Sequence, residues 1–113
     1  MVSIRARKPP VQVSSGNVFA DLGLPDAEER QTKVRLAVAI QRSIAVLGLT
    51  QAEVARVLGT SQPKVSALVS TRLEGFSVER LMNFLAALGN DVEIVVRKRR
   101  PARGPGKIHV AEP

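Results

Sequence analysis

The fold is decided by residues 49–69, which read LTQAEVARVLGTSQPKVSALV. Two short helical patterns flank a three-residue turn that begins at Gly59. Thr50 is the expected N-cap of the first helix, and Glu53, three residues later, completes a capping box. Ser61 is the expected N-cap of the second helix, whose first turn tolerates a proline. This pattern predicts two helices joined by a tight turn, which is a helix-turn-helix.

Apolar side chains on the two short helices are spaced so that they meet. Val54 and Leu58 lie on one face of the first helix, and Val65 and Leu68 lie on one face of the second. Ala55 falls where the helices would cross, and its small side chain lets the two backbones approach. We therefore expect these two faces to be buried and the opposite face of the second helix to be exposed.

Helices are also expected on both sides of this pair. The first begins near Asp26, which forms a capping box with Glu29, and it ends at Gly48. Its apolar stripe consists of Leu36 or Ala37, Ile40, Ile44 and Leu47. The last begins after Ser77, ends at Gly89 and has its stripe at Leu81, Leu85 and Leu88.

A change of period follows the last helix. Between Val92 and Arg97, β-branched residues recur at every second position, which is typical of a strand. One strand cannot satisfy its own backbone groups, so we expect it to pair with the same strand of a second subunit. Such a two-stranded ribbon sets two recognition helices about 34 Å apart. The predicted fold is mainly α, a bundle of four to five helices with one C-terminal strand paired across a dimer.

The positive charge lies at the two ends of the chain. The net charge is +7 over 113 residues. Residues 1–8 hold three basic and no acidic side chains, residues 97–113 hold six and one, and residues 9–96 hold eight and nine. We expect flexible basic tails at 1–15 and 98–113, around a helix-turn-helix domain with its C-terminal strand at 16–97. The C-terminal cluster either clamps the phosphates of a nucleic acid or only solubilises the chain.

The motif resembles the lambda-repressor-like, Xre/Cro-type family of DNA-binding proteins. The resemblance rests on the motif and its flanking helices over residues 27–89. The matching residues are Leu49, Thr50, Gln51, Ala55, Gly59, Gln62, Val65 and Leu68. In that family the second short helix enters the major groove with its N-terminus first. The resemblance implies a transcriptional regulator, and a repressor in particular, that binds double-stranded operator DNA.

The expected DNA-facing residues follow from that geometry. Gln62 can pair with adenine, Lys64 can reach guanine or a phosphate, and Ala67 offers a methyl contact to thymine. Gln51 is expected to anchor a phosphate through its backbone N–H, with its amide near Gln62. The remaining candidates are Ser61, Pro63 and Ser66 on the second short helix, and Arg42, Ser70 and Arg72 as phosphate contacts.

The flanking segments narrow the resemblance. Residues 17–29, which begin Asn-Val-Phe-Ala-Asp-Leu, and residues 84–96 are similar to the HigA-type antitoxins. That resemblance implies a bacterial antitoxin that represses its own operon as a homodimer and neutralises a HigB/RelE-like messenger-RNA-cleaving toxin. A stand-alone Xre-family regulator with no toxin is the alternative. Val18, Phe19, Leu22 and Leu24 form an apolar cluster that either packs on the core or anchors a toxin.

Other functional classes find little support in the sequence. The chain has one histidine, His109, and no cysteine, so we expect neither catalysis nor a metal or other cofactor. It has no Trp or Tyr on which single-stranded RNA could stack. A helical protein-interaction module remains a further alternative. The lack of cysteine and of a long apolar run predicts a cytoplasmic protein that binds DNA in the nucleoid and no membrane.

Overall fold

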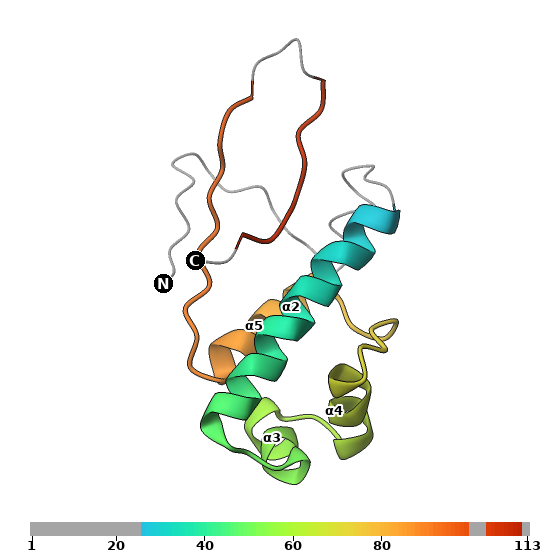
Figure 1. Cartoon of the computed structure of the whole chain (residues 1–113), viewed down its shortest axis with the longest axis vertical. Coiled ribbons are helices and arrows are strands. Elements are labelled where there is room, and N and C mark those ends of the chain that lie inside the picture. The colour runs from blue at the N-terminus through green and yellow to red at the C-terminus, as the bar shows by residue number, and fades with distance from the viewer. Residues whose placement is uncertain (1–25, 100–103, 112–113) are drawn as a thin grey trace.

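The computed structural model describes residues 26–99 and 104–111 of the chain. This part contains four helices, which are α2 (Asp26–Leu47), α3 (Gln51–Leu58), α4 (Gln62–Val69) and α5 (Val78–Ala87). α2 packs against α5, and α3 packs against α4 (Figure 1). The mainly helical fold expected from the sequence is confirmed. The N-terminal tail at 1–15 and the apolar cluster at 18–24 lie outside the described residues.

The long helix α2 forms because no glycine or proline interrupts residues 27–47. Its inner stripe is buried at Leu36, Ala37 and Ile40, as the spacing predicts. Leu47 is 51% exposed, so the stripe ends one turn earlier than expected and the last turn of α2 leaves the core. Gly48 then adopts a left-handed conformation with φ of 68°, which ends the helix.

The short helices α3 and α4 are fixed by their caps. The Thr50 side chain accepts a hydrogen bond from the Glu53 N–H, and the Glu53 carboxylate accepts one from the Thr50 N–H at 2.8 Å. Gly59, with φ of 67°, ends α3 in the left-handed conformation that glycine tolerates best. The Ser61 hydroxyl accepts from the Lys64 N–H at 3.3 Å and starts α4. Both predicted caps are confirmed.

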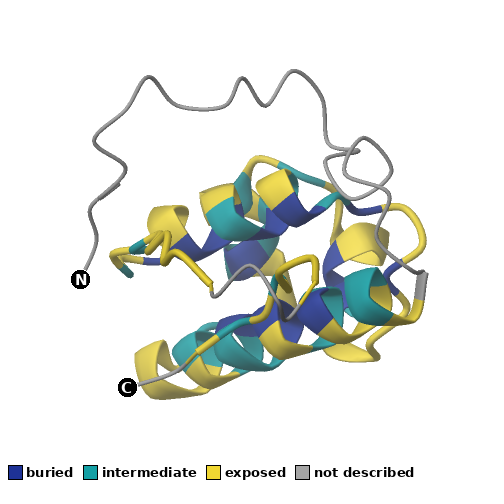
Figure 2. Cartoon of the chain, turned by 90° about the horizontal axis from the view of Figure 1, so that it is seen from above, coloured by how far each residue is buried: buried dark blue, intermediate teal, exposed yellow. Residues whose placement is uncertain are grey.

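The core lies where α2, α4 and α5 meet. Its members are Leu36, Ala37, Ile40, Leu68, Leu73, Phe76, Val78, Leu81, Phe84, Leu85 and Leu88. The buried faces of the helices point toward this centre and the exposed faces point outward (Figure 2). Leu73 and Phe76 belong to the connection between α4 and α5, where no helical period marks them as buried. That connection is therefore anchored to the core.

The chain beyond α5 is extended. The Asn90 side-chain amide donates to the Ser43 hydroxyl at 2.8 Å and to the Leu85 carbonyl at 3.0 Å, tying the end of α5 to α2. Residues 91–99 then run on with a single β-bridge at Ile94, and no regular strand is present within the described residues. The strand at Val92–Arg97 and its pairing across a dimer therefore stay predictions.

The C-terminal segment 104–111 returns to α2. Ile108 and Val110 are partly buried against the core cluster. The Arg35 guanidinium donates to the Val110 carbonyl at 3.4 Å. In the sequence, residues 104–111 belong to a tail rich in proline and glycine. Ile108 and Val110 nevertheless occupy alternate positions of this tail, and both side chains face α2.

The capping box of α3 makes stability depend on pH. Hydrogen bonds from Thr50, the backbone N–H first, lower the pKa of Glu53 below its ordinary value of 4.5. A carboxyl whose pKa is lower in the folded state stabilises the fold above pH 4.5 and loses this contribution as the pH falls through the folded-state pKa. We expect Glu53→Ala to lower the free energy of unfolding at pH 7 and to have much less effect at pH 3.

Urea denaturation at the two pH values measures this difference. Glu74→Ala is the control, because Glu74 is an exposed carboxylate in the connection before α5. If the Glu53→Ala deficit is as large at pH 3 as at pH 7, the capping carboxylate is not its cause.

Candidate nucleic-acid interface

The N-terminus of α4 is the most open part of the helix pair. Ser61, Gln62, Pro63 and Lys64 are all exposed. The first turn of α4 contains no acidic residue, so the partial positive charge of the helix N-terminus is not neutralised from within the helix. This end of α4 presents the Lys64 charge and the positive end of the helix dipole, which suit a polyanion, while Pro63 adds no N–H and the Lys64 N–H is bonded to Ser61.

The opposite face of α4 is buried at Val65 and Leu68, whereas Val69 at the end of the helix is 41% exposed. Val65 and Leu68 have no exposed surface, and neither has Val54 of α3. This packing fixes the rotation of α4 about its own axis, and with it the direction in which Gln62 and Lys64 point. The face expected to read DNA and the face expected to pack are therefore separated as the sequence predicts.

The other predicted site residues are more scattered. Ser66 and Ala67 are half-buried, and Ala67 packs against the core cluster. Ser70 caps the C-terminal end of α4, and Arg72 follows it, so both lie at the opposite end of the helix from Gln62. Arg42 is exposed on α2.

Gln51 is exposed at the start of α3. No hydrogen bond joins its side chain to that of Gln62 among the residues that the structure describes. The geometry leaves the Gln51 side chain available to solvent.

Gln41 of α2 contributes to the site, although no sequence pattern identifies it. Its side-chain nitrogen donates to the carbonyls of Leu68 at 3.1 Å and Val69 at 3.2 Å. These carbonyls belong to the last turn of α4. The Leu68 carbonyl also accepts from the Thr71 N–H at 3.1 Å, whereas the Val69 carbonyl lies beyond the regular helical pattern. Gln41 thus clamps the C-terminal end of α4 to α2, while the Ser61 cap holds the other end. A lone glutamine in an amphipathic helix gives no sequence signal of this role.

An aromatic group lies under the N-terminal end of α4. The ring of Phe76 is buried, and the ring of Phe84 meets it edge to face at 6.0 Å between centroids. The Lys64 ammonium lies 5.7 Å from the Phe76 centroid. The Arg80 guanidinium lies 6.0 Å from the same centroid and 5.4 Å from that of Phe84. Sequence reasoning assigned no function to Phe76 or Arg80.

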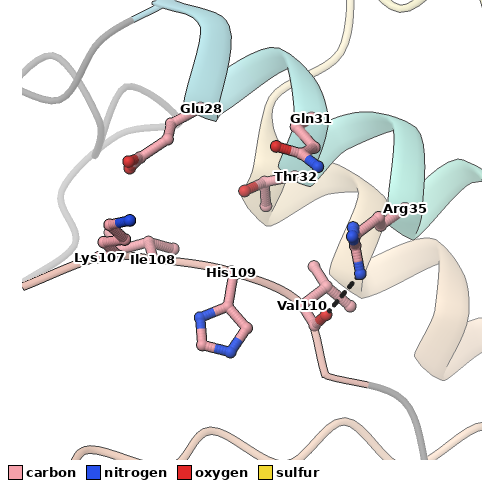
Figure 3. A pocket seen from close by; sticks show the side chains of 8 residues that line it. All are labelled: Glu28, Gln31, Thr32, Arg35, Lys107, Ile108, His109 and Val110. Carbon is pink, nitrogen blue, oxygen red and sulfur yellow. Dashed lines mark hydrogen bonds between the residues drawn. The ribbon is translucent and has the colours of Figure 1, made fainter.

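A separate hollow of about 280 Å³ lies between α2 and the returning C-terminal segment (Figure 3). Figure 3 shows Glu28 of α2 pointing toward Lys107 and Ile108, and Arg35 pointing to the Val110 carbonyl. One carboxylate oxygen of Glu28 is buried there without a hydrogen-bond partner among the described residues. Across residues 26–99 and 104–111, no cluster of three side chains could hold a metal ion, and no helix is long and apolar enough to cross a membrane.

Comparison with known proteins agrees with this geometry. A family model described as a helix-turn-helix domain matches residues 18–97. A solved structure of a protein named "Putative XRE Family Transcriptional Regulator" is 56% identical to this chain, covers 79% of it and 100% of its own length, and superimposes with a TM-score of 0.72. A search of curated proteins gives no match.

The class of protein follows from the fold, the exposed α4 terminus and these matches. The chain belongs to the helix-turn-helix family of DNA-binding proteins. Within that family it is a transcriptional regulator of the XRE type.

The Gln41 clamp gives a testable consequence. Gln41→Ala removes the side-chain donor shared by the Leu68 and Val69 carbonyls, which we expect to lower the free energy of unfolding by about 1 kcal/mol. We also expect Gln41→Ala to increase the rate of amide hydrogen exchange, relative to the wild type, more in α4 than in α5. Gln31→Ala is the matched control, because Gln31 is an exposed glutamine of the same helix. Equal effects of the two substitutions on α4 exchange would show that Gln41 is no clamp.

Proposed function

We propose that this regulator recognises a specific double-stranded operator by placing the N-terminus of α4 in the major groove, and that it represses transcription from that site. The observation that carries the proposal is the exposure of Gln62 and Lys64 on a helix whose opposite side is anchored by the fully buried Val65 and Leu68. A helix held in this way presents its side chains to DNA with little entropy left to lose on binding.

Each exposed residue has a role in this proposal. The Gln62 amide pairs with an adenine edge, and Lys64 contacts guanine or a phosphate. Ser61, Pro63 and the exposed part of Ser66 line the groove. Ala67 offers thymine only the part of its methyl group that the core leaves free. Phosphate contacts come from Gln51, Arg42, Ser70 and Arg72.

The proposed regulator is a homodimer. Ile94, Val95 and Val96 are 40%, 49% and 71% exposed, which leaves a run of apolar residues open on an extended backbone. A second copy of the same segment offers both apolar surface and backbone partners for it. Pairing through Val92–Arg97 places two copies of α4 on one face of the DNA, as a palindromic operator requires.

We further propose an antitoxin role, in which the dimer represses its own operon in a bacterial cytoplasm and neutralises a HigB/RelE-like toxin. The resemblance of residues 17–29 and 84–96 to HigA-type antitoxins supports this role. The test is co-purification of the full chain with the product of the adjacent reading frame. A complex in which that product no longer cleaves messenger RNA is expected. If no complex forms, the chain is a stand-alone regulator.

Substitution of Gln62 tests the reading head. We expect Gln62→Ala to weaken binding to the preferred duplex by about 1–3 kcal/mol and to relax the choice of base at one position of each half-site. The preferred duplex is obtained by selection from a random-sequence library, and affinities are measured by fluorescence anisotropy at fixed salt. Gln31→Ala is the control on α2 and is expected to bind as the wild type does. Unchanged affinity and preference in Gln62→Ala would favour a protein-interaction module.

Substitution of Val96 tests the dimer. Val96→Lys places two like charges across the proposed ribbon, so we expect a monomer by light scattering at micromolar concentration where the wild type is a dimer. Val46→Lys is the control, because Val46 is 85% exposed on α2 and outside the ribbon. A wild-type monomer, or a Val96→Lys dimer as stable as the wild type, would contradict this interface.

A further inference from the structure

We propose that Arg80 is a second cationic DNA contact and that it binds a phosphate. The Phe76 ring positions Arg80 together with Lys64, so that the two cations face the DNA backbone and the groove edge. The inference rests on the proposed function, since it assumes that the N-terminus of α4 meets DNA. It adds a residue from α5 to the interface and assigns a task to a buried aromatic ring.

The Phe76 ring brings two cationic side chains together. Lys64 and Arg80 come from different helices, yet both charges lie within 6.0 Å of the centroid of this one ring. The ring itself is held by its edge-to-face contact with Phe84 and is 4% exposed, so its position is set by the core. The ring thus connects the packing of the core to the directions of two long, otherwise mobile side chains.

Arg80 places a positive charge in the first turn of α5. Ser77 is the N-cap of α5 and its hydroxyl accepts from the Arg80 N–H at 3.1 Å, so Arg80 is in the first turn. A cation in the first turn of a helix is disfavoured by the helix dipole, which prefers a negative charge there. The contacts with two aromatic faces offset that cost, but a neutral side chain in this place would avoid it. The charge itself therefore requires another explanation.

The Arg80 guanidinium has no carboxylate partner in the described part of the chain. Across residues 26–99 and 104–111, no carboxylate lies within salt-bridge distance of its guanidinium. The only side-chain oxygen that it reaches there is the Thr60 hydroxyl, at 3.5 Å, a long contact. Thr60 belongs to the turn between α3 and α4, so Arg80 lies beside the turn of the helix-turn-helix, and the Thr60 contact uses one of its five N–H donors.

A single polyanion satisfies both cations. Lys64 and Arg80 both place a positive charge beside the Phe76 ring, and a DNA backbone that binds both offsets their like charge. Arg80 has the planar donor fork that suits phosphate, and Lys64 is the residue nearer to the groove-facing Gln62. The ring is a positioning element and makes no contact with DNA in this proposal.

The test is the salt dependence of binding to the duplex selected by the wild-type protein. We expect Arg80→Gln to reduce the slope of log affinity against log salt concentration by about 0.9, which corresponds to one phosphate contact. The base preference should be unchanged, because a phosphate contact carries no sequence choice. Arg35→Gln is the matched control. It removes the same charge from the side of α2 that faces the C-terminal segment, and we expect the wild-type slope.

A second arm tests the positioning role of the ring. Phe76→Leu keeps an apolar side chain but removes the aromatic face, and we expect about two- to five-fold weaker binding at temperatures where the variant is fully folded. In the Lys64→Gln, Arg80→Gln background the same substitution should have no further effect on affinity. A purely structural role would weaken binding equally in both backgrounds. In the free protein, the side-chain methylene protons of Lys64 should also lose their ring-current shift in Phe76→Leu.

The outcomes separate this inference from the proposed function. If Arg80→Gln binds with the wild-type salt slope while Gln62→Ala still relaxes base preference, the inference is overturned and the reading head stands. An equal effect of Phe76→Leu in both backgrounds overturns the positioning role. Failure of the wild type to select any duplex overturns the proposed function and this inference together.

Discussion

The burial of one face of α4 is the constraint on which the rest of the structure depends. An eight-residue helix is too short to be stable alone in water, so α4 exists because Val65 and Leu68 are removed from solvent. Their partners are Val54 of α3 and the core formed with α2 and α5. This packing leaves α4 one orientation, in which the polar N-terminal residues face outward. The buried face thus determines where the functional face points.

The fixed position of α4 lets one small domain combine an apolar packing face with an exposed polar face. Both ends of α4 are fixed by polar contacts, the Ser61 hydroxyl at the start and the Gln41 amide at the finish. Between them the apolar contacts set the rotation. The positive charge of the whole chain is mostly at its ends, and the exposed N-terminal turn of α4 itself carries only Lys64. The proposed recognition of DNA therefore depends on the placement of α4 more than on net charge.

The sequence predicted the helices well because their boundaries depend on local chemistry. Thr50, Glu53 and Ser61 act within three residues of their partners, so spacing alone identifies the caps. Gly48 and Gly59 end helices for a reason that is also local, their left-handed backbone. The exposed positions Gln62 and Lys64 followed from the same periodicity.

Contacts between distant segments could not be read in this way. Gln41 meets α4 across 27 residues, and Arg80 meets Thr60 across 20. Phe76 lies in a connection without periodicity, so its burial depends on tertiary packing alone. Of the strand expected at 92–97, only a β-bridge at Ile94 is present in the described residues, and its pairing across a dimer stays a prediction.

The central claim is that the N-terminus of α4 meets DNA. The most direct measurement is an NMR titration of the full chain with the selected duplex, followed through the backbone amide signals. We expect the largest shifts at Ser61, Gln62, Lys64 and Gln51, while residues 107–110 beside α2 stay nearly unchanged. Shifts that are confined to residues 107–110, or that avoid α4 altogether, would contradict it.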